Sequence, residues 1–448
     1  MTRQLSLREA CDAVLTWPWL HDLAAAVPAQ RVGRPRQHPV ALHLAWAALA
    51  RLHGSQNRLD VETRHPDAWR RIVTTYNRAA RVHPDGVTVD PWCQRLTAHT
   101  HRHARDLLCG GAVLDALTSA FTTCAVAQAQ QLGLLTLRGG SLTRPSPLRI
   151  VYGDGTVVRP IYKNREANGR RRDPDAAEHV RHDGAVVGTN IVFVAARGPE
   201  HHHRVVLAAG RVPGPGAEAA TALELLSRVI AAAGGGVQAV VYDGAFRGAH
   251  HHQLMHHHGV YVINKVHPAA RTDTGRTYRT VPLGTWTHTT PRGRDCHHHL
   301  AAHHGDLHDT VTTDDGTLTL GPALHRPQLR RHRRADGTWR FNIAAVVPCR
   351  HGDFIAWVNP HPDAGDRNAG RTDQLRLLPE SSPRFPGIYG LRNDSEAINA
   401  EFKRTFVADR APALGWRRQL LAALAWAITN NARAHHLHHA THSRRSVA

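Results

Sequence analysis

The sequence predicts a mixed α/β core that is preceded by an all-α module and interrupted by a mostly β insertion. Over residues 1–145 apolar residues recur at helical spacing, typical of an all-α module. In residues 146–266 apolar, glycine-separated runs alternate with helical stretches in the order βββαβαβ, which indicates an α/β layer with a mixed sheet. Residues 267–380 are rich in Thr, Gly, His and Arg with short alternating pieces, which favours a β insertion. Residues 381–448 return to helical spacing and would complete the core with two helices.

Capping signals place the helices of residues 1–145. Ser6 and Glu9 have the spacing of a capping box ahead of LREACDAVL. Pro39 is expected at the first position of the next helix, which would end at Gly54. Further helices are expected over residues 67–82, from Asp90-Pro91 onward, and over residues 111–132.

A basic stretch, RVGRPRQHP, lies between the first two of these helices. Arg34 and Arg36 flank Pro35, as in arms that enter a narrow minor groove, where arginine follows the negative potential. We therefore take both arginines as candidate DNA-binding residues of a helical DNA-binding module. A basic linker between helices explains the same residues.

Composition limits the partners and the compartment. A formal charge of +20 and a pI near 10.9 favour a polyanion, most simply nucleic acid, although a GC-rich coding bias also raises arginine and histidine content. The six cysteines are scattered without a CxxC pair, which is typical of free thiols in a reducing cytoplasm. Charges interrupt the first residues too early for a secretory signal, and no apolar run reaches the roughly 18 residues of a membrane span. We expect a cytoplasmic, nucleoid-associated chain of two or three domains with no membrane partner.

Four polar side chains recur in residues 388–406, IYGLRNDSEAINAEFKRTF. Tyr389, Arg392, Glu396 and Lys403 lie at offsets of 0, 3, 7 and 14. In a single helix, about 100° per residue brings all four within roughly 60° of one another. A solvated helix face also explains mixed charges at such spacing. However, the chain has 56 Lys and Arg residues of which three are lysines, so a lysine here favours a specific point charge for one phosphate.

Two aspartates follow apolar runs of the expected core. Asp154 follows IVYG in the first strand, and Asp243 follows VVY in the fourth. Burying an unpaired carboxylate costs free energy, which favours a function, whereas an aspartate before glycine is also a common turn residue. If these two strands are neighbours, Asp154 and Asp243 would converge, and a helix packed behind them could bring Glu396 to the same point.

Three carboxylates at one point would require divalent cations. Within about 4 Å each pair would repel by roughly 4 kcal/mol at an effective dielectric constant of about 20. An oxygen-only ligand set suits Mg²⁺ or Mn²⁺ better than Zn²⁺. Two such ions about 3.5–4 Å apart hold the attacking and leaving oxygens of a phosphodiester during in-line displacement. The sequence therefore predicts two Mg²⁺ or Mn²⁺ ions beside a row of cations that would hold DNA phosphates.

These segments resemble the DDE transposases of bacterial insertion sequences, in the group marked by a Tyr-Arg-Glu-Lys signature. GDGT, DGAFR and YGLRNDSEAINAEFK match that pattern in order, and the long insertion between the second aspartate and the glutamate also fits. The resemblance covers roughly residues 146–440 and implies a ribonuclease H-like core. It implies a metal-dependent enzyme that hydrolyses DNA at the ends of its element and joins the freed 3′-OH to a target.

The same resemblance implies roles for individual residues. Asp154, Asp243 and Glu396 would be the catalytic metal ligands. Tyr389, Arg392 and Lys403 would contact DNA near the cut. The implied partner is double-stranded DNA, as terminal inverted repeats and target, bound by a homodimer or higher oligomer.

Other interpretations remain open at this point. A ribonuclease H-like nuclease without strand transfer, or a catalytically inactive DNA-binding protein derived from a transposase, would share most of these features. Some members of the group stabilise a DNA hairpin with a tryptophan of the insertion, for which Trp286 and Trp339 are candidates, although a core role is commoner. Two His-rich stretches, residues 250–258 and 296–308, have spacings that could bind Zn²⁺, as in a His-rich metal-binding protein.

Overall fold

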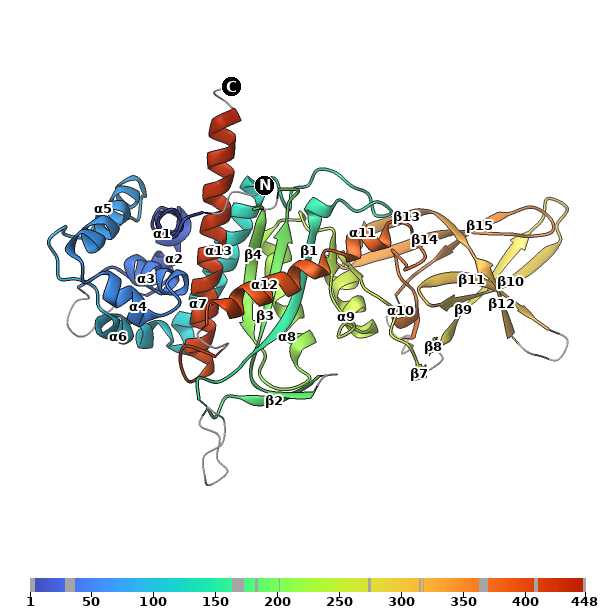
Figure 1. Cartoon of the computed structure of the whole chain (residues 1–448). Helices are drawn as coiled ribbons and strands as arrows, with labels where there is room; N and C mark the ends of the chain where they lie inside the picture. The colour runs from blue at the N-terminus through green and yellow to red at the C-terminus, as the bar shows by residue number, and fades with distance from the viewer. Residues whose placement is uncertain are drawn as a thin grey trace. The chain divides into compact units, whose positions relative to one another are not determined.

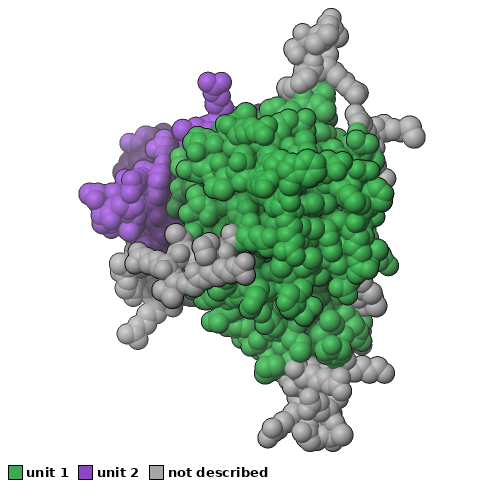
Figure 2. Space-filling view, turned by 90° about the vertical axis from the view of Figure 1, so that its left-hand side faces the viewer, with its two compact units in different colours: residues 1–136, 153–234, 395–448 green, residues 137–152, 235–394 purple. Residues whose placement is uncertain are grey.

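The chain folds into two compact units. The computed structural model describes residues 5–28, 37–162, 173–181, 184–200, 202–272, 275–313, 316, 318–361, 370–406 and 410–445. Unit 1 comprises residues 1–136, 153–234 and 395–448, and unit 2 comprises residues 137–152 and 235–394, coloured separately in Figure 2. The chain is mixed α/β with a mixed sheet, which confirms the prediction at that level of detail.

The amino-terminal part of unit 1 is helical. Ser6 forms the predicted capping box, since its Oγ accepts from the Glu9 N–H at 3.3 Å and its own N–H donates to Glu9 Oε2 at 2.9 Å. The helices described here are α1 (Leu7–Leu15), α2 (Trp19–Ala25), α3 (Val40–Leu52), α4 (Gln56–Glu62), α5 (Pro66–Val82), α6 (Ala98–Leu108) and α7 (Gly111–Gln131).

Three details of this helical part differ from the prediction. Pro39 precedes the first turn of α3 as its N-cap instead of occupying the first helical position. The helix expected from Asp90 is wrong, because the Asp90 carboxylate accepts the Trp92 N–H at 2.9 Å and closes a turn, and α6 starts only after Thr97. Helices α2 and α4 were not foreseen, and both are only seven residues long. Arg34 and Arg36 lie outside the described residues.

The longest helix of unit 1, α13 (Trp416–Arg445), lies against α3, α1 and β4 (Figure 1). Thr429 Oγ1 donates to the Ala48 carbonyl of α3 at 3.2 Å. Two tryptophans are buried close to this contact in the sequence, Trp46 on α3 and Trp426 on α13. Helix α7 is long and apolar enough to cross a membrane by length and composition, which the sequence analysis did not single out. Since 56% of its apolar window is buried inside the structure, α7 has the pattern of a core helix, and it packs on β4.

The main sheet has the order β2-β3-β1-β5-β6, with β4 paired to β3. β1 pairs in parallel with β5, and β5 with β6, whereas β3 pairs antiparallel with β2 and β4. Helix α8 (Glu218–Ala232) packs on β3 and β4. β2 was not foreseen, and the other strands match predicted runs. The strands are β1 (Ile150–Val158), β2 (Ala177–Arg181), β3 (Gly184–Arg197), β4 (Arg204–Arg211), β5 (Ala239–Val241) and β6 (Tyr261–Ile263).

The remainder of unit 2 is built mainly of antiparallel strands, as its composition predicts. The strand orders are β12-β11-β10-β9, β13-β14-β15 and β7-β8. The strands are β7 (Ala270–Thr272), β8 (Gly275–Thr277), β9 (Thr280–Thr289), β10 (Asp295–His303), β11 (Asp306–Thr312), β12 (Leu318–Ala323), β13 (His325–Arg333), β14 (Trp339–Val347) and β15 (Phe354–Val358). The helical elements are α9 (Gly248–Gln253), the π-helix η2 (Leu254–His258), α10 (Gly370–Gln374) and α11 (Phe385–Tyr389).

Candidate functional site

Of the two aspartates, one lies within a strand of the main sheet and the other directly follows the neighbouring strand. β1 and β5 are parallel, with Tyr152 opposite Val241 as the last registered pair. Both residues of this pair are fully buried. Asp154 lies two residues after that pair within β1, and Asp243 lies two residues after it, beyond the end of β5. The first and fourth strands expected from the sequence are therefore side by side, and the two aspartates occupy equivalent positions relative to the register.

Asp154 is held by a helix from the other end of the chain. It is half-buried in β1, and its Oδ2 accepts a hydrogen bond from Asn399 Nδ2 at 3.0 Å. The same amide nitrogen lies 3.4 Å from the Gly155 carbonyl oxygen. Asn399 belongs to α12 (Arg392–Arg404), so this helix packs beside Asp154 within unit 1. Asn399 was not among the predicted site residues, although it lies three residues after Glu396 inside the signature segment, residues 388–406.

A second carboxylate lies on the opposite face of β1. A Cβ atom at position 155 would lie 2.2 Å from Glu218 Oε2, so the Glu218 carboxylate approaches β1 closely at this glycine. Asn190 Nδ2 donates to Glu218 Oε2 at 2.8 Å. Because successive strand residues point to opposite faces, Asp154 faces α12 whereas position 155 faces α8. Glu218 is therefore separated by the strand from the face that carries Asp154.

The signature segment forms two helices, so the expectation of one helix is wrong. The short α11 (Phe385–Tyr389) has Pro386 in its first turn and Gly390 as its C-cap, and α12 begins at Arg392. Tyr389 therefore lies at the end of α11 and does not share a helix face with the other three residues. Arg392, Glu396 and Lys403 all belong to α12, at offsets of 0, 4 and 11, and fall within roughly 40° of one another.

The exposed edge of α12 carries Glu396. Phe402 and Ile398 are buried on the packed side, and the Phe402 ring lies 5.0 Å from the Phe193 ring of β3. Glu396 is exposed, whereas Asn399, about 60° away around the helix, is 9% exposed and touches Asp154. Glu396 is therefore on the solvent-facing border of the helix face that packs beside Asp154, within unit 1.

Asp243 shapes a turn in unit 2. Its Oδ1 accepts the Ala245 N–H at 2.8 Å, as the turn interpretation predicts. Asn264 Nδ2 donates to the carbonyl oxygens of Asp243 and Phe246, both at 3.2 Å. The buried Arg376 in turn donates from Nε to Asn264 Oδ1 at 2.9 Å, which fixes the amide's orientation. A buried polar network therefore holds the backbone that presents Asp243.

Tyr389 lies beside one of the three lysines of the chain. The Lys265 ammonium is 5.9 Å from the centroid of the Tyr389 ring, and it also lies 3.9 Å from Glu380 Oε2. The Phe385 ring stacks on the Tyr389 ring, with centroids 5.0 Å apart. Lys265 was not among the predicted site residues, although the rarity of lysine in the chain was a usable signal.

Trp339, one of the two tryptophans of the insertion, packs against backbone. A Cβ atom at Gly259 would lie 2.6 Å from the Trp339 ring, and Gly259 has a φ of +65°, which also favours glycine. Arg331 stacks over the same ring at 4.9 Å. Trp286 is half-exposed on β9.

The two His-rich stretches do not gather their ligands. In β10 successive side chains alternate, so His297 and His299 bond to Thr287 and Thr285 on one face while His298 bonds to Asp309 on the other. In residues 250–258 the rings of His252 and His256 stack with centroids 5.0 Å apart. Among the described residues, groups of three ligating atoms within 4.8 Å occur elsewhere, at Asp22, His83 and Asp85 and at His202, His203 and His438.

The carboxylates of Asp154 and Asp243 are oxygen donors, the ligand type that suits Mg²⁺ or Mn²⁺. No protein-family model and no curated protein matches the chain.

Proposed function

We propose that the chain is a cut-and-paste DNA transposase of the DDE type with a ribonuclease H-like core. The observation that carries the proposal is the parallel register of β1 and β5, because Asp154 and Asp243 follow the pair Tyr152–Val241 by the same two residues. Asp243 follows the carboxyl end of β5, and the carboxyl ends of parallel strands are where α/β proteins gather catalytic groups. The hydrogen bond from Asn399 to Asp154 supports Glu396 as the third acid, because it fixes the helix that carries Glu396 beside β1.

Asp154, Asp243 and Glu396 would hold two Mg²⁺ or Mn²⁺ ions, which supply charge neutralisation and an activated water or 3′-OH for phosphodiester displacement. Asn399 orients the Asp154 carboxylate by donating to Oδ2, so that Oδ1 keeps its direction. Asn264 and Arg376 hold the turn of Asp243 in the same way through its backbone. The chain would thus supply the acids together with buried side chains that hold two of them in place, Asn399 for Asp154 and Asn264 with Arg376 for Asp243.

Three cations on α12 or beside Tyr389 would bind DNA phosphates. Arg392 and Lys403 lie on the helix face of Glu396, and Lys265 lies over Tyr389 in unit 2. With a formal charge of +20, the chain favours double-stranded DNA, at the ends of its element and at the target. A homodimer or higher oligomer, a cytoplasmic location at the nucleoid, and no membrane partner complete the proposal.

The test uses three isosteric variants, Asp154→Asn, Asp243→Asn and Glu396→Gln. Each removes a charge and keeps its shape, so we expect cleavage of duplexes covering the DNA on either side of the coding sequence to be lost. DNA affinity should stay within about twofold of the parent, because phosphate contacts from arginine and lysine dominate it. Glu401→Gln is the matched control, since Glu401 is on the same helix but pairs with Arg204 at 3.6 Å.

The same assay separates the rival functions. Loss of DNA binding in all three variants would mean that the acids are structural. Cleavage without joined products would favour a nuclease without strand transfer. A parent chain that binds DNA and never cuts with Mg²⁺ or Mn²⁺ would favour a DNA-binding protein derived from a transposase.

A further inference from the structure

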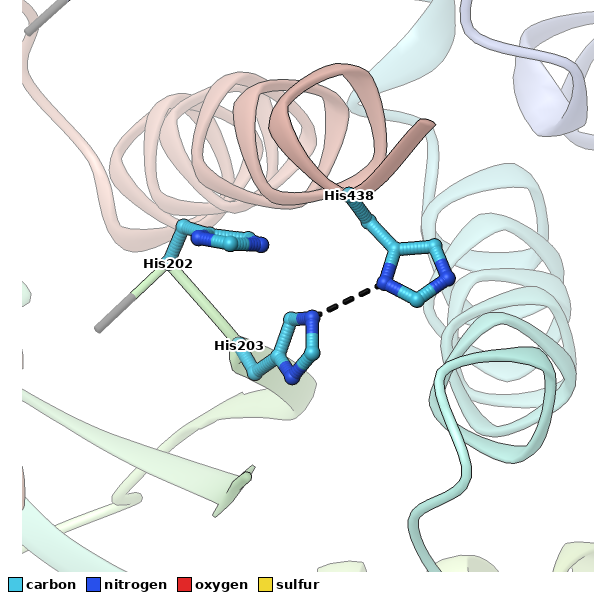
Figure 3. A group of neighbouring side chains, drawn as sticks. All are labelled: His202, His203 and His438. Carbon is cyan, nitrogen blue, oxygen red and sulfur yellow. Dashed lines mark hydrogen bonds between the residues drawn. The ribbon is translucent and has the colours of Figure 1, made fainter. Parts of the chain in front are cut away.

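Three histidines that are distant in sequence meet in unit 1. His202 and His203 precede β4, and His438 belongs to α13 (Figure 3). One ring nitrogen of each lies within 4.8 Å of one from both others. His203 Nε2 and His438 Nδ1 are hydrogen-bonded at 2.9 Å, and the rings of His202 and His203 have centroids 4.4 Å apart.

The backbone around this cluster is fixed on the side of α13. Asn431 is buried, and its side chain donates to the Val206 carbonyl at 2.8 Å and accepts the Val206 N–H at 2.9 Å. Asn430 Nδ2 donates to the Arg204 carbonyl at 2.9 Å. His438 follows Asn431 by seven residues, about two helical turns, so it falls on the same face of α13. The asparagine contacts therefore direct His438 toward the residues before β4.

The backbone is also fixed on the side of β4. The Gly198 N–H donates to the His203 carbonyl at 2.8 Å, and the His203 N–H donates to the Glu200 carbonyl at 2.9 Å. A Cβ atom at position 198 would lie 2.8 Å from the His203 Cβ, so glycine is required for this close turn. His203 is 5% exposed. The cluster is thus part of a packed turn and not a chance approach of mobile surface side chains.

We propose that His202, His203 and His438 form a binding site for a late first-row divalent cation, with Zn²⁺ as the physiological ligand. Nitrogen-only donors suit Zn²⁺, Co²⁺, Ni²⁺ or Cu²⁺ and disfavour Mg²⁺, so this site takes a different cation from the carboxylates. In tetrahedral coordination at about 2.0–2.1 Å, ligand nitrogens lie about 3.3 Å apart. The 2.9 Å pair needs to open by only a few tenths of an ångström, with the cation replacing the shared proton.

Such a site would fasten the end of α13 to the sheet. Beyond Asn431 the helix continues to Arg445, and His438 is two turns into that extension. Three imidazoles leave the fourth position of a tetrahedral ion for water or another ligand. Because the cluster lies wholly within unit 1 and uses none of the acids above, this inference stands or falls independently of the proposed function.

The test measures hydrogen exchange in the full chain after chelator treatment, with and without Zn²⁺. At about ten times its Kd, Zn²⁺ should slow exchange of peptides covering residues 432–441 about tenfold. His438→Ala and His203→Ala should abolish this slowing. His436→Ala is the control, because His436 is on the same helix and outside the cluster, and it should behave as the parent. Circular dichroism would verify that each variant is folded.

A chain with 37 histidines offers weak sites elsewhere, so a competing chelator sets the free Zn²⁺ concentration. Co²⁺ provides a second readout, because one equivalent in the parent should give the visible absorption of tetrahedral coordination. His202→Ala, which leaves the buried His203 in place, should lose that absorption even if the other variants misfold. Equal slowing in the parent and in His438→Ala, or Co²⁺ absorption unchanged in His202→Ala, would overturn the proposal.

Discussion

Asn399 Nδ2 donates to Asp154 Oδ2 at 3.0 Å, across 245 residues of sequence. This contact ties α12 to β1 at the strand position that follows the buried run. In the proposed enzyme Asn399 is a positioning residue, because it acts on Asp154 and not on the DNA.

Replacing Asn399 with alanine should impair cleavage by way of Asp154. Loss of the amide frees the carboxylate to rotate, so we expect a decrease of about 10–100-fold in the cleavage rate, the range seen for outer-shell partners of metal ligands. Raising the Mn²⁺ concentration should recover part of the rate. Asn393→Ala, at an exposed position of the same helix, is the control. A structural role alone would give no response to Mn²⁺.

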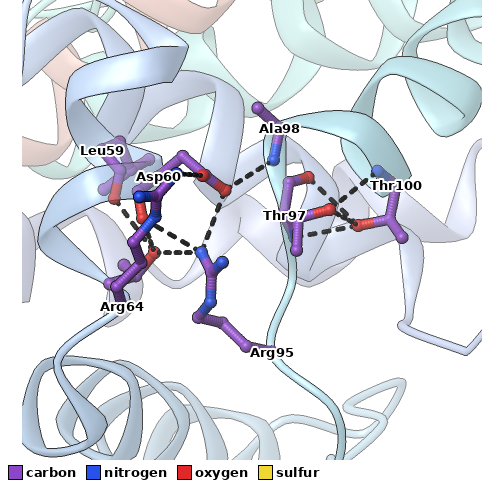
Figure 4. Close-up of polar contacts among 8 residues, drawn as sticks. Leu59, Asp60, Arg64, Arg95, Thr97, Ala98 and Thr100 are labelled. Carbon is purple, nitrogen blue, oxygen red and sulfur yellow. Dashed lines mark hydrogen bonds and ion pairs between the residues drawn. The ribbon is translucent and has the colours of Figure 1, made fainter.

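The half-buried ion pair of Asp60 and Arg95 should stabilise the helical part of unit 1 above acidic pH (Figure 4). Asp60 Oδ1 accepts from Arg95 Nη1 and from the Ala98 N–H, both at 2.9 Å. Burial alone would raise the pKa of Asp60, but the Ala98 N–H and Arg95 outweigh it and lower the pKa. Because the pKa of Asp60 is lower in the folded state, the carboxylate contributes to the free energy of unfolding at pH values above its unfolded pKa of about 3.9. This contribution is lost as the pH falls through the folded pKa.

Asp60→Asn should therefore destabilise α4 and α6 at pH 7 by about 1–3 kcal/mol, the cost of leaving a charged partner unsatisfied. Hydrogen exchange of peptides covering residues 56–62 and 98–108 measures this locally. The difference from the parent should shrink as the pH is lowered below about 4. Asp67→Asn should change little, because Asp67 is 74% exposed where it pairs with Arg70. A difference that stays constant with pH would contradict the assignment.

Cys349 should be a reactive thiol at neutral pH. The His351 N–H and the His288 side chain stabilise its thiolate and lower the pKa of Cys349 to about 6. Alkylation by iodoacetamide should be close to its plateau at pH 7 and fall about tenfold per pH unit below 6. Peptide mass spectrometry measures the rate. Cys124 is the internal control, because burial raises the pKa of its thiol to about 12. A Cys349 rate that still climbs tenfold between pH 7 and 8 would be that of an ordinary thiol.

DNA binding should weaken steeply with salt. Each neutralised phosphate contributes about −0.9 to the slope of log affinity against log salt concentration. Arg392→Gln and Lys403→Gln should each reduce the magnitude of that slope by about 1, measured by fluorescence anisotropy with a labelled duplex. Arg228→Gln should leave it unchanged, since Arg228 pairs with Glu224 on α8. An unchanged slope in the Arg392 and Lys403 variants would remove α12 from the DNA-binding surface.

Local signals in the sequence predicted local structure well. The capping box of Ser6 and Glu9, the long apolar α7 and the runs that became β1, β3 and β4 all depend on neighbours within one element. The break between α11 and α12 also had a local signal, namely Pro386 and Gly390. The charge pattern that runs across these residues nevertheless suggested one helix. Short elements such as α2 and α4 carry too few periodic positions to stand out.

Contacts between distant residues could not be predicted in the same way. Asn399 meets Asp154, and His203 meets His438 across 235 residues, only because helices pack on particular strands. The histidines of β10 gave a metal-like spacing that pleating separates onto two faces. The register of β1 against β5 gives Asp154 and Asp243 equal offsets from the Tyr152–Val241 pair. The spacing of residues along the sequence does not contain this information.

The central claim is that Asp154, Asp243 and Glu396 form one metal site. A crystal of the full chain soaked in Mn²⁺ tests it directly by anomalous diffraction. The account predicts that the three carboxylates converge within about 4–7 Å around Mn²⁺ peaks about 3.5–4 Å apart, and that Asp154→Asn removes the peaks. Carboxylates that point apart, with no Mn²⁺ at either aspartate even when DNA is bound, would contradict it.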